Sequence, residues 1–214
     1  MYMHRRLPVA LVALWLFLPL GVSTTSAAGR ADSSAVVDLS TIHIGNFGRV
    51  DPYYFRGEQP QGRDYTDLAK IGVKTVIDLQ ADGNNQDEER LVKNAGMQFY
   101  RIPMTTHVTP TIDQLATFMG IVTDAARQPV YVHCAGGKHR TGVMTAVYRI
   151  ERHGWTTDQA FKEMQQYKFG ASMLHAEFKK FVYDYRPLEI LRTQATAPGQ
   201  VSVTQQQRSG GGQQ

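Results

Sequence analysis

A reactive cysteine is the first feature that this sequence suggests. Cys134 is the only cysteine among 214 residues, so it cannot form a disulfide within the chain. The short β-branched and aromatic segment 130–132 precedes it, and a loop with two glycines and three basic side chains follows. A helical pattern begins after this loop. The order strand, loop, helix predicts that backbone N–H groups and a helix N-terminus converge near Cys134, where an anion or a thiolate is stabilised.

The residues after Cys134 are of the types that an attack on a phosphate ester requires. Gly136 and Gly137 allow the backbone to curl so that several N–H groups point inward. Arg140 can bind two phosphoryl oxygens with its planar guanidinium group. Thr141 can hydrogen-bond to the sulfur when the sulfur becomes the leaving group. We therefore predict a phosphate-binding loop that consists of Ala135, Gly136, Gly137, Lys138, His139 and Arg140.

Two of the basic side chains in this loop suggest a hypothesis about the substrate. Lys138 and His139 would give the loop a cationic mouth that suits polyphosphorylated ligands. Alternatively, they serve only to stabilise the thiolate of Cys134, and the two uses are compatible.

The segment from His133 to Gly142 resembles the signature of the cysteine-dependent protein tyrosine and dual-specificity phosphatase superfamily: a His-Cys pair, five further residues, then Arg and Ser or Thr. The segment 137–142 is similar to that of the plant and fungal atypical dual-specificity phosphatases, which act on inositol pyrophosphates or phosphoproteins. The segments 54–60 and 75–79 also look like that family, of which this chain would be a secreted bacterial relative.

The resemblance implies an activity and roles for individual residues. Cys134 would be the nucleophile that forms a phosphocysteine, Arg140 would bind phosphate, and His133 would support the cysteine. Such a phosphatase would hydrolyse phosphate monoesters or phosphoanhydrides, of the phosphotyrosine, inositol polyphosphate or pyrophosphate type. It would need no cofactor and no metal.

The residues of the loop exclude two other kinds of site and leave two alternative functions open. A P-loop of a nucleoside triphosphatase would need Ser or Thr where His139 stands. The spacing of His133, Cys134 and His139 matches no common zinc pattern. A rhodanese-like sulfurtransferase usually has a loop that is one residue shorter. This activity and a catalytically weak phosphate-binding module stay as alternatives.

The general acid of the superfamily is missing from its usual place. Many members have an Asp in the loop that here contains Thr105 and Thr106. His107 lies in this loop and is our candidate acid, because imidazole can donate a proton near pH 7. Asp113 and Asp82 are two further candidates. The absence of a protein acid would favour aryl phosphate or pyrophosphate substrates, whose leaving groups need protonation less than an alkoxide does.

Hydrophobic periodicity and turn residues predict alternating strands and helices. We expect strands at 42–44, 53–55, 75–79, 98–102 and 130–132. We expect helices at 65–71, 87–95, 111–122, 143–153, 156–164 and 174–185. This alternation predicts an α/β domain with a central, mostly parallel sheet flanked by helices, which is the fold that the resemblance implies, with the first short strands as antiparallel edges. Ligands of such sheets bind at the carboxyl ends of the strands, where Cys134 lies.

The chain divides into four segments. Residues 1–28 are typical of a secretory signal peptide, with basic residues, an apolar run over 7–22 and then small residues. That run is shorter than the roughly 18 to 20 residues of a membrane-spanning helix and contains prolines. We therefore expect a secreted or periplasmic protein without a stable membrane span after cleavage. A flexible segment 29–40, a phosphatase domain 41–190 and a disordered tail 193–214 would follow.

The charge restricts the partners of the protein. The formal net charge is +4, and Arg5 and Arg6 contribute two of the positive charges, so the chain after the signal peptide is close to neutral. This argues against a broad nucleic-acid-binding surface. We expect a monomer whose partner is a phosphorylated small molecule or a phosphoprotein.

Overall fold

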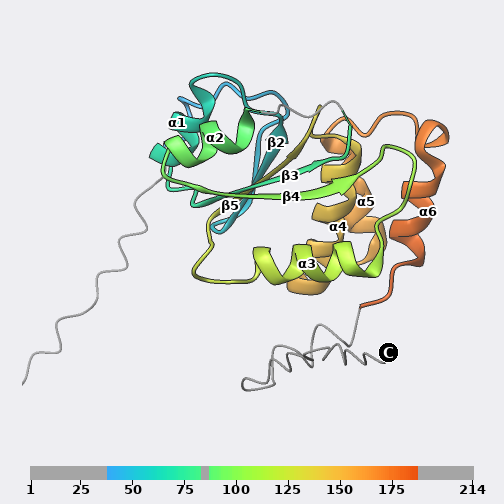
Figure 1. Ribbon diagram of the computed structural model, residues 1–214. Coiled ribbons are helices and arrows are strands. Elements are labelled where there is room, and N and C mark those ends of the chain that lie inside the picture. The colour runs from blue at the N-terminus through green and yellow to red at the C-terminus, as the bar shows by residue number, and fades with distance from the viewer. Residues whose placement is uncertain (1–37, 83–86, 188–214) are drawn as a thin grey trace, which may run out of the picture. The chain divides into compact units, whose positions relative to one another are not determined.

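A computed structural model describes residues 38–82 and 87–187 (Figure 1). The predicted signal peptide, the predicted tail and most of the predicted flexible segment lie outside the described residues. The boundaries of the phosphatase domain remain a prediction. Within the described part of the chain, no helix is long and apolar enough to cross a membrane.

A five-stranded sheet forms the centre of the described chain. Its spatial order is β1-β2-β5-β3-β4. The strands are β1 Gly48–Asp51, β2 Tyr54–Glu58, β3 Thr75–Gln80, β4 Gln98–Met104 and β5 Val130–Cys134. All neighbouring strands are parallel except β1, which pairs antiparallel with β2. The predicted α/β class, with a mostly parallel sheet and an antiparallel edge, is confirmed.

The antiparallel edge strand is not the segment that the sequence suggested. Residues 42–44 form no strand, and the edge strand is instead β1, in which Gly48 pairs with Arg56. Ile44 is buried, and it belongs to the same apolar cluster as Phe55 and Tyr131. The apolar pattern of 42–44 therefore reflects burial against the sheet and not strand pairing.

Helices cover both faces of the sheet (Figure 1). The helices are α1 Asp64–Lys70, α2 Glu88–Asn94, α3 Ile112–Val122, α4 His139–His153, α5 Thr157–Gln166 and α6 Ala176–Asp184, with the short 3₁₀ helix η1 Ser172–His175 before α6. Thr111 with Gln114 and Thr156 with Gln159 form capping boxes at the starts of α3 and α5.

Neighbouring residues of each strand contribute to two different cores, because successive side chains point to opposite faces of a sheet. Tyr131 packs in the cluster that includes the α1 and α2 side chains Leu68 and Val92. Val132 packs in the cluster that includes the side chains of α3 to α6, such as Phe118. This second core anchors α4 behind the loop that follows β5.

Candidate active site

The predicted strand, loop and helix are confirmed around Cys134. Strand β5 lies between β2 and β3, and all five of its residues are buried. Cys134 is its last residue and is 3% exposed, and α4 begins at His139. Since β2, β3 and β5 are parallel, their carboxyl ends meet at the edge of the sheet where the loop 135–138 begins.

Gly137 shapes this loop because no other residue fits its position. Its φ angle is +61°, in the left-handed region that favours glycine. A Cβ atom at Gly137 would lie 2.4 Å from the carbonyl carbon of Gly57 in β2. The loop is therefore in close backbone contact with the end of β2.

Two side chains that the sequence analysis did not assign to the site hold the carbonyl groups of the loop. Arg56 Nη2 donates a hydrogen bond of 2.6 Å to the Gly137 carbonyl oxygen, and Asn46 Nδ2 donates one of 2.9 Å to the same atom. In a trans peptide the C=O of one residue and the N–H of the next point in opposite directions. The Lys138 N–H therefore points away from Arg56 and Asn46. These two hydrogen bonds fix its direction, and the local sequence pattern does not reveal them.

The N-terminus of α4 supplies further amide donors. Lys138 precedes the helix, makes no side-chain capping hydrogen bond and is exposed. The first N–H groups of a helix have no partner within the helix, and the helix dipole adds positive potential there. This end of α4 can therefore bind an anion, as the sequence predicted.

His139 does not add the positive charge that we expected at the mouth of the loop. Its Nε2 lies 2.9 Å from the Phe169 carbonyl oxygen, and its ring centroid lies 3.7 Å from that of His175. Burial, and after it the nearby His175, holds the pKa of His139 below its usual value of 6.5. The ring is therefore neutral at pH 7, which leaves Lys138 and Arg140 as the cations of this loop.

Arg140 is buried and directed toward the carboxyl ends of β3 and β4. Its Nη1 donates hydrogen bonds of 2.6 Å to Asp82 Oδ1 and of 3.0 Å to the Met104 carbonyl oxygen. The Asp82 side chain is 62% exposed. The hydrogen bond from Arg140 is the main reason that the pKa of Asp82 lies below its usual value of 3.8. The Asp82 carboxylate thus accepts a hydrogen bond from the guanidinium group that we expect to bind phosphate.

Thr141 follows Arg140 in α4 and is completely buried. Among the described residues, its hydroxyl group has no hydrogen-bond partner, so the expected contact with the cysteine sulfur is not formed in this structure. An unpartnered buried hydroxyl is costly, because it has lost its hydrogen bonds to water. Its donor is available to a group that enters the loop.

His133 immediately precedes Cys134 and is completely buried, and two acidic side chains lie near its ring. Its Nε2 lies 3.0 Å from Glu88 Oε1, and its Nδ1 lies 4.0 Å from Asp78 Oδ1. Gln59 Nε2 donates a hydrogen bond to the other oxygen of Glu88 at 3.2 Å. His133 was predicted to support Cys134, and two buried carboxylates lie next to its ring. They lie far from His133 in the sequence, so the local sequence pattern did not reveal them.

The candidate general acids occupy three different places. His107 Nδ1 lies 3.3 Å from Glu177 Oε1, and its ring stacks on that of His175. Asp113 is exposed in the first turn of α3, where a carboxylate stabilises the helix N-terminus. Of the three, Asp82 is the one for which a contact with Arg140 is found.

The sequence is similar to those of known phosphatases. Residues 36–181 match the family model described as "DSP-PTPase phosphatase fused to NAD+ Kinase". The dual specificity protein phosphatase TpbA of Pseudomonas aeruginosa is 28% identical over 77% of this chain and 72% of its own length. The inositol diphosphatase SIW14 of Saccharomyces cerevisiae is 25% identical over 73% of this chain and 57% of its own length. The inositol diphosphatase DSP4 of Arabidopsis thaliana is 26% identical over 64% of this chain and 70% of its own length.

Solved structures share the fold. The catalytic core of SIW14 from S. cerevisiae, crystallised with citrate, has a TM-score of 0.63 and 24% identity over 72% of this chain and 93% of that chain. The crystal structure of P. aeruginosa TpbA has a TM-score of 0.59 and 24% identity over 71% of this chain and 91% of that chain. The sheet and its flanking helices are therefore those of these enzymes.

Proposed function

The chain belongs to the DSP-PTPase family of cysteine-dependent phosphatases, and we propose that it cleaves its phosphorylated substrate through a phosphocysteine on Cys134. The observation that supports this most is the position of Cys134, at the end of the central strand and before the amides of the 135–138 loop. In the first step the Cys134 thiolate attacks phosphorus, and the bond between phosphorus and the leaving oxygen breaks.

Arg140 and the loop amides hold the phosphoryl group in this proposal. The guanidinium group of Arg140 binds two phosphoryl oxygens. The N–H of Lys138 points away from Arg56 and Asn46, and in this proposal it donates to the phosphoryl group. Water then cleaves the S–P bond in the second step, and the sulfur leaves as a thiolate. The free donor of Thr141 stabilises the departing sulfur.

We further propose aryl phosphates and phosphoanhydrides as the substrates. The carboxyl group that touches Arg140 is the ionised Asp82, which is a poor proton donor as it stands. A phenolate or a phosphate departs without protonation more easily than an alkoxide does. This proposal is supported by the names of two relatives, which are inositol diphosphatases, and by a TpbA variant that was crystallised with phosphotyrosine. The exposed cation of Lys138 suits a ligand with several phosphates.

A panel of phosphorylated compounds tests both proposals. We expect phosphate release from phosphotyrosine and from inositol pyrophosphates, weaker release from phosphoserine, and no release by Cys134→Ser. A rapid acid quench of wild type should trap a phosphocysteine. Phosphate release that persists in Cys134→Ser would contradict the assignment of Cys134 as the nucleophile. A thiosulfate-dependent persulfide on Cys134 without phosphate release would instead identify a sulfurtransferase.

A further inference from the structure

Two groups of metal-ligating side chains occur among the described residues. The first group consists of Asp78, Glu88 and His133. It is completely buried, and both of its carboxylates already accept hydrogen bonds from neighbouring side chains. The second group consists of His107, His175 and Glu177. It lies outside the phosphate-binding loop, and the proposed mechanism does not use it.

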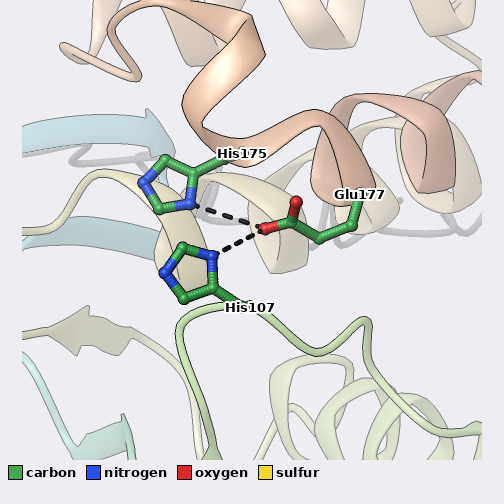
Figure 2. A group of neighbouring side chains, drawn as sticks. All are labelled: His107, His175 and Glu177. Carbon is green, nitrogen blue, oxygen red and sulfur yellow. Dashed lines mark ion pairs between the residues drawn. The ribbon is translucent and has the colours of Figure 1, made fainter.

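The three side chains of the second group come from two distant parts of the sequence and face one another (Figure 2). His107 lies in the loop after β4, His175 ends η1, and Glu177 lies in the first turn of α6. Figure 2 shows both imidazole rings turned toward one carboxylate oxygen of Glu177. One possible ligand atom from each of the three side chains lies within 4.8 Å of those from the other two.

The distances fit a metal ion better than direct hydrogen bonds. His107 Nδ1 and His175 Nδ1 lie 3.3 and 3.5 Å from Glu177 Oε1. Charge-assisted N–H···O hydrogen bonds are shorter, about 2.7–2.9 Å. Around a zinc ion with bonds of roughly 2.0–2.1 Å, the corners of a tetrahedron lie about 3.4 Å apart. The carboxylate oxygen is therefore separated from each nitrogen as two ligands of one ion would be.

Two of the three ligand atoms have no other partner. Glu177 Oε1 and His175 Nδ1 are shielded from solvent, and among the described residues neither has a hydrogen bond of acceptable geometry. His175 as a whole is 8% exposed. Buried polar atoms without partners are rare and costly in native proteins. A negative charge on Glu177 is stabilised by its position in the first turn of α6. This position does not explain why two imidazole nitrogens point at its carboxylate.

The ligand types restrict the metal. Two imidazoles and one carboxylate with an open fourth position form a set that is known for zinc. Calcium and magnesium bind almost entirely through oxygen, so this site does not suit them. Cobalt(II) also accepts imidazole ligands and can report on the same site by its absorption.

We propose that His107, His175 and Glu177 form a zinc site that fastens the loop after β4 to α6. The His175 ring lies against that of His139, the first residue of the signature helix α4, so the ion would also be close to the phosphate-binding loop. His107 bound to the metal through Nδ1 cannot take the imidazolium form, which is the form that would protonate a leaving group near pH 7. The zinc is thus assigned to the structure of this loop and not to the phosphoryl transfer.

Metal titration of the full chain tests this site. The protein should carry no affinity tag and should contain Cys134→Ser, which removes the thiolate as a competing ligand. We expect one equivalent of Zn²⁺ by calorimetry and visible absorption bands of tetrahedral Co²⁺. His107→Ala and Glu177→Gln should each weaken zinc binding by at least about tenfold, since even partners outside the coordination sphere contribute that much. His43→Ala, which removes an exposed histidine elsewhere, is the matched control and should bind like the parent.

Each outcome of this titration decides the proposal. His107 is 70% exposed, so its replacement is expected to leave the fold intact, and the melting temperature of the metal-free variants checks this. The absence of saturable zinc binding in the parent, or a loss smaller than tenfold in a folded His107→Ala, would overturn the site. Binding that persists in His107→Ala would point to the group around His133. All proteins in this titration contain Cys134→Ser and therefore lack the proposed nucleophile. The result is thus independent of the proposed phosphatase mechanism.

Discussion

Arg56 is a buried cation next to the reactive part of the molecule. It is 0% exposed, its guanidinium group lies 4.0 Å above the Tyr167 ring, and its Nε and Nη1 have no hydrogen-bond partner among the described residues. Burial lowers the pKa of Arg56, and nearby groups that include Cys134 raise it. Arginine stays charged even so. The fold thus tolerates a costly buried cation that holds the Gly137 carbonyl oxygen of the phosphate-binding loop.

Asp82 competes with substrate for Arg140, and its removal should strengthen the binding of phosphate. The lowered pKa of Asp82 keeps this carboxylate charged throughout the neutral range, so the competition is present at every working pH. We expect Asp82→Asn to lower the inhibition constant of phosphate or vanadate by about two- to fivefold, the range that corresponds to an exposed ion pair. The effect should shrink in high salt.

Asp113→Asn is the matched control for this change, because it removes an exposed carboxylate from the first turn of α3. It should leave the inhibition constant unaltered. Weaker phosphate binding in Asp82→Asn would mean that Asp82 orients Arg140 for phosphate and does not compete with it.

At the scale of the elements, the approach of the 135–138 loop to the end of β2 depends on Gly137. An alanine there would need a strained backbone and would place its Cβ 2.4 Å from Gly57. We expect Gly137→Ala to lower kcat/KM by about a hundredfold or more, because displacing a catalytic loop by 1 Å can cost that much. Steady-state kinetics with an aryl phosphate measures this effect.

Gly136→Ala is the internal comparison. A Cβ at Gly136 would lie 3.6 Å from its nearest neighbour, which is the flexible Lys138 side chain. Its activity should stay within a few-fold of wild type. If the two alanine variants lose activity equally, the backbone contact between the loop and β2 is not what shapes the site.

The elements near Cys134 were predictable from sequence because their signals are local. The order strand, glycine loop, helix and both capping boxes depend on residues a few positions apart. The partners of these elements were not predictable. Arg56 and Asn46 reach Gly137 from far along the chain, and His107 meets His175 and Glu177 from another element. Such contacts depend on how the sheet brings its edges together, which local periodicity does not encode.

At the scale of the whole molecule, one sheet joins two cores, and each core contains a completely buried tyrosine. Tyr54 belongs to the core of α3 to α6, and Tyr131 belongs to the core of α1 and α2. Desolvation by burial raises the pKa of both phenols above the usual value of 10.0. A buried phenolate would lack the hydration that it has in the unfolded chain.

The raised pKa values predict that alkali destabilises the fold. Below about pH 10 both states keep these phenols neutral, and the stability is unaffected. Above it, the unfolded chain releases the protons and the folded chain retains them. The free energy of unfolding should then fall by about 1.4 kcal/mol per pH unit for each tyrosine, until the pH reaches its folded pKa.

Urea unfolding between pH 8 and 11 measures this decline, and Tyr54→Phe isolates one of its sources. The variant loses the 3.1 Å hydrogen bond between Tyr54 and Thr145, which should cost about 1 kcal/mol at pH 8. Because phenylalanine cannot ionise, the stability curves of Tyr54→Phe and wild type should converge as the pH rises above 10. Tyr53→Phe, at a neighbouring position that is 54% exposed, should stay parallel to wild type. Parallel curves for Tyr54→Phe and wild type would show that Tyr54 ionises as readily in the folded protein as in the unfolded chain.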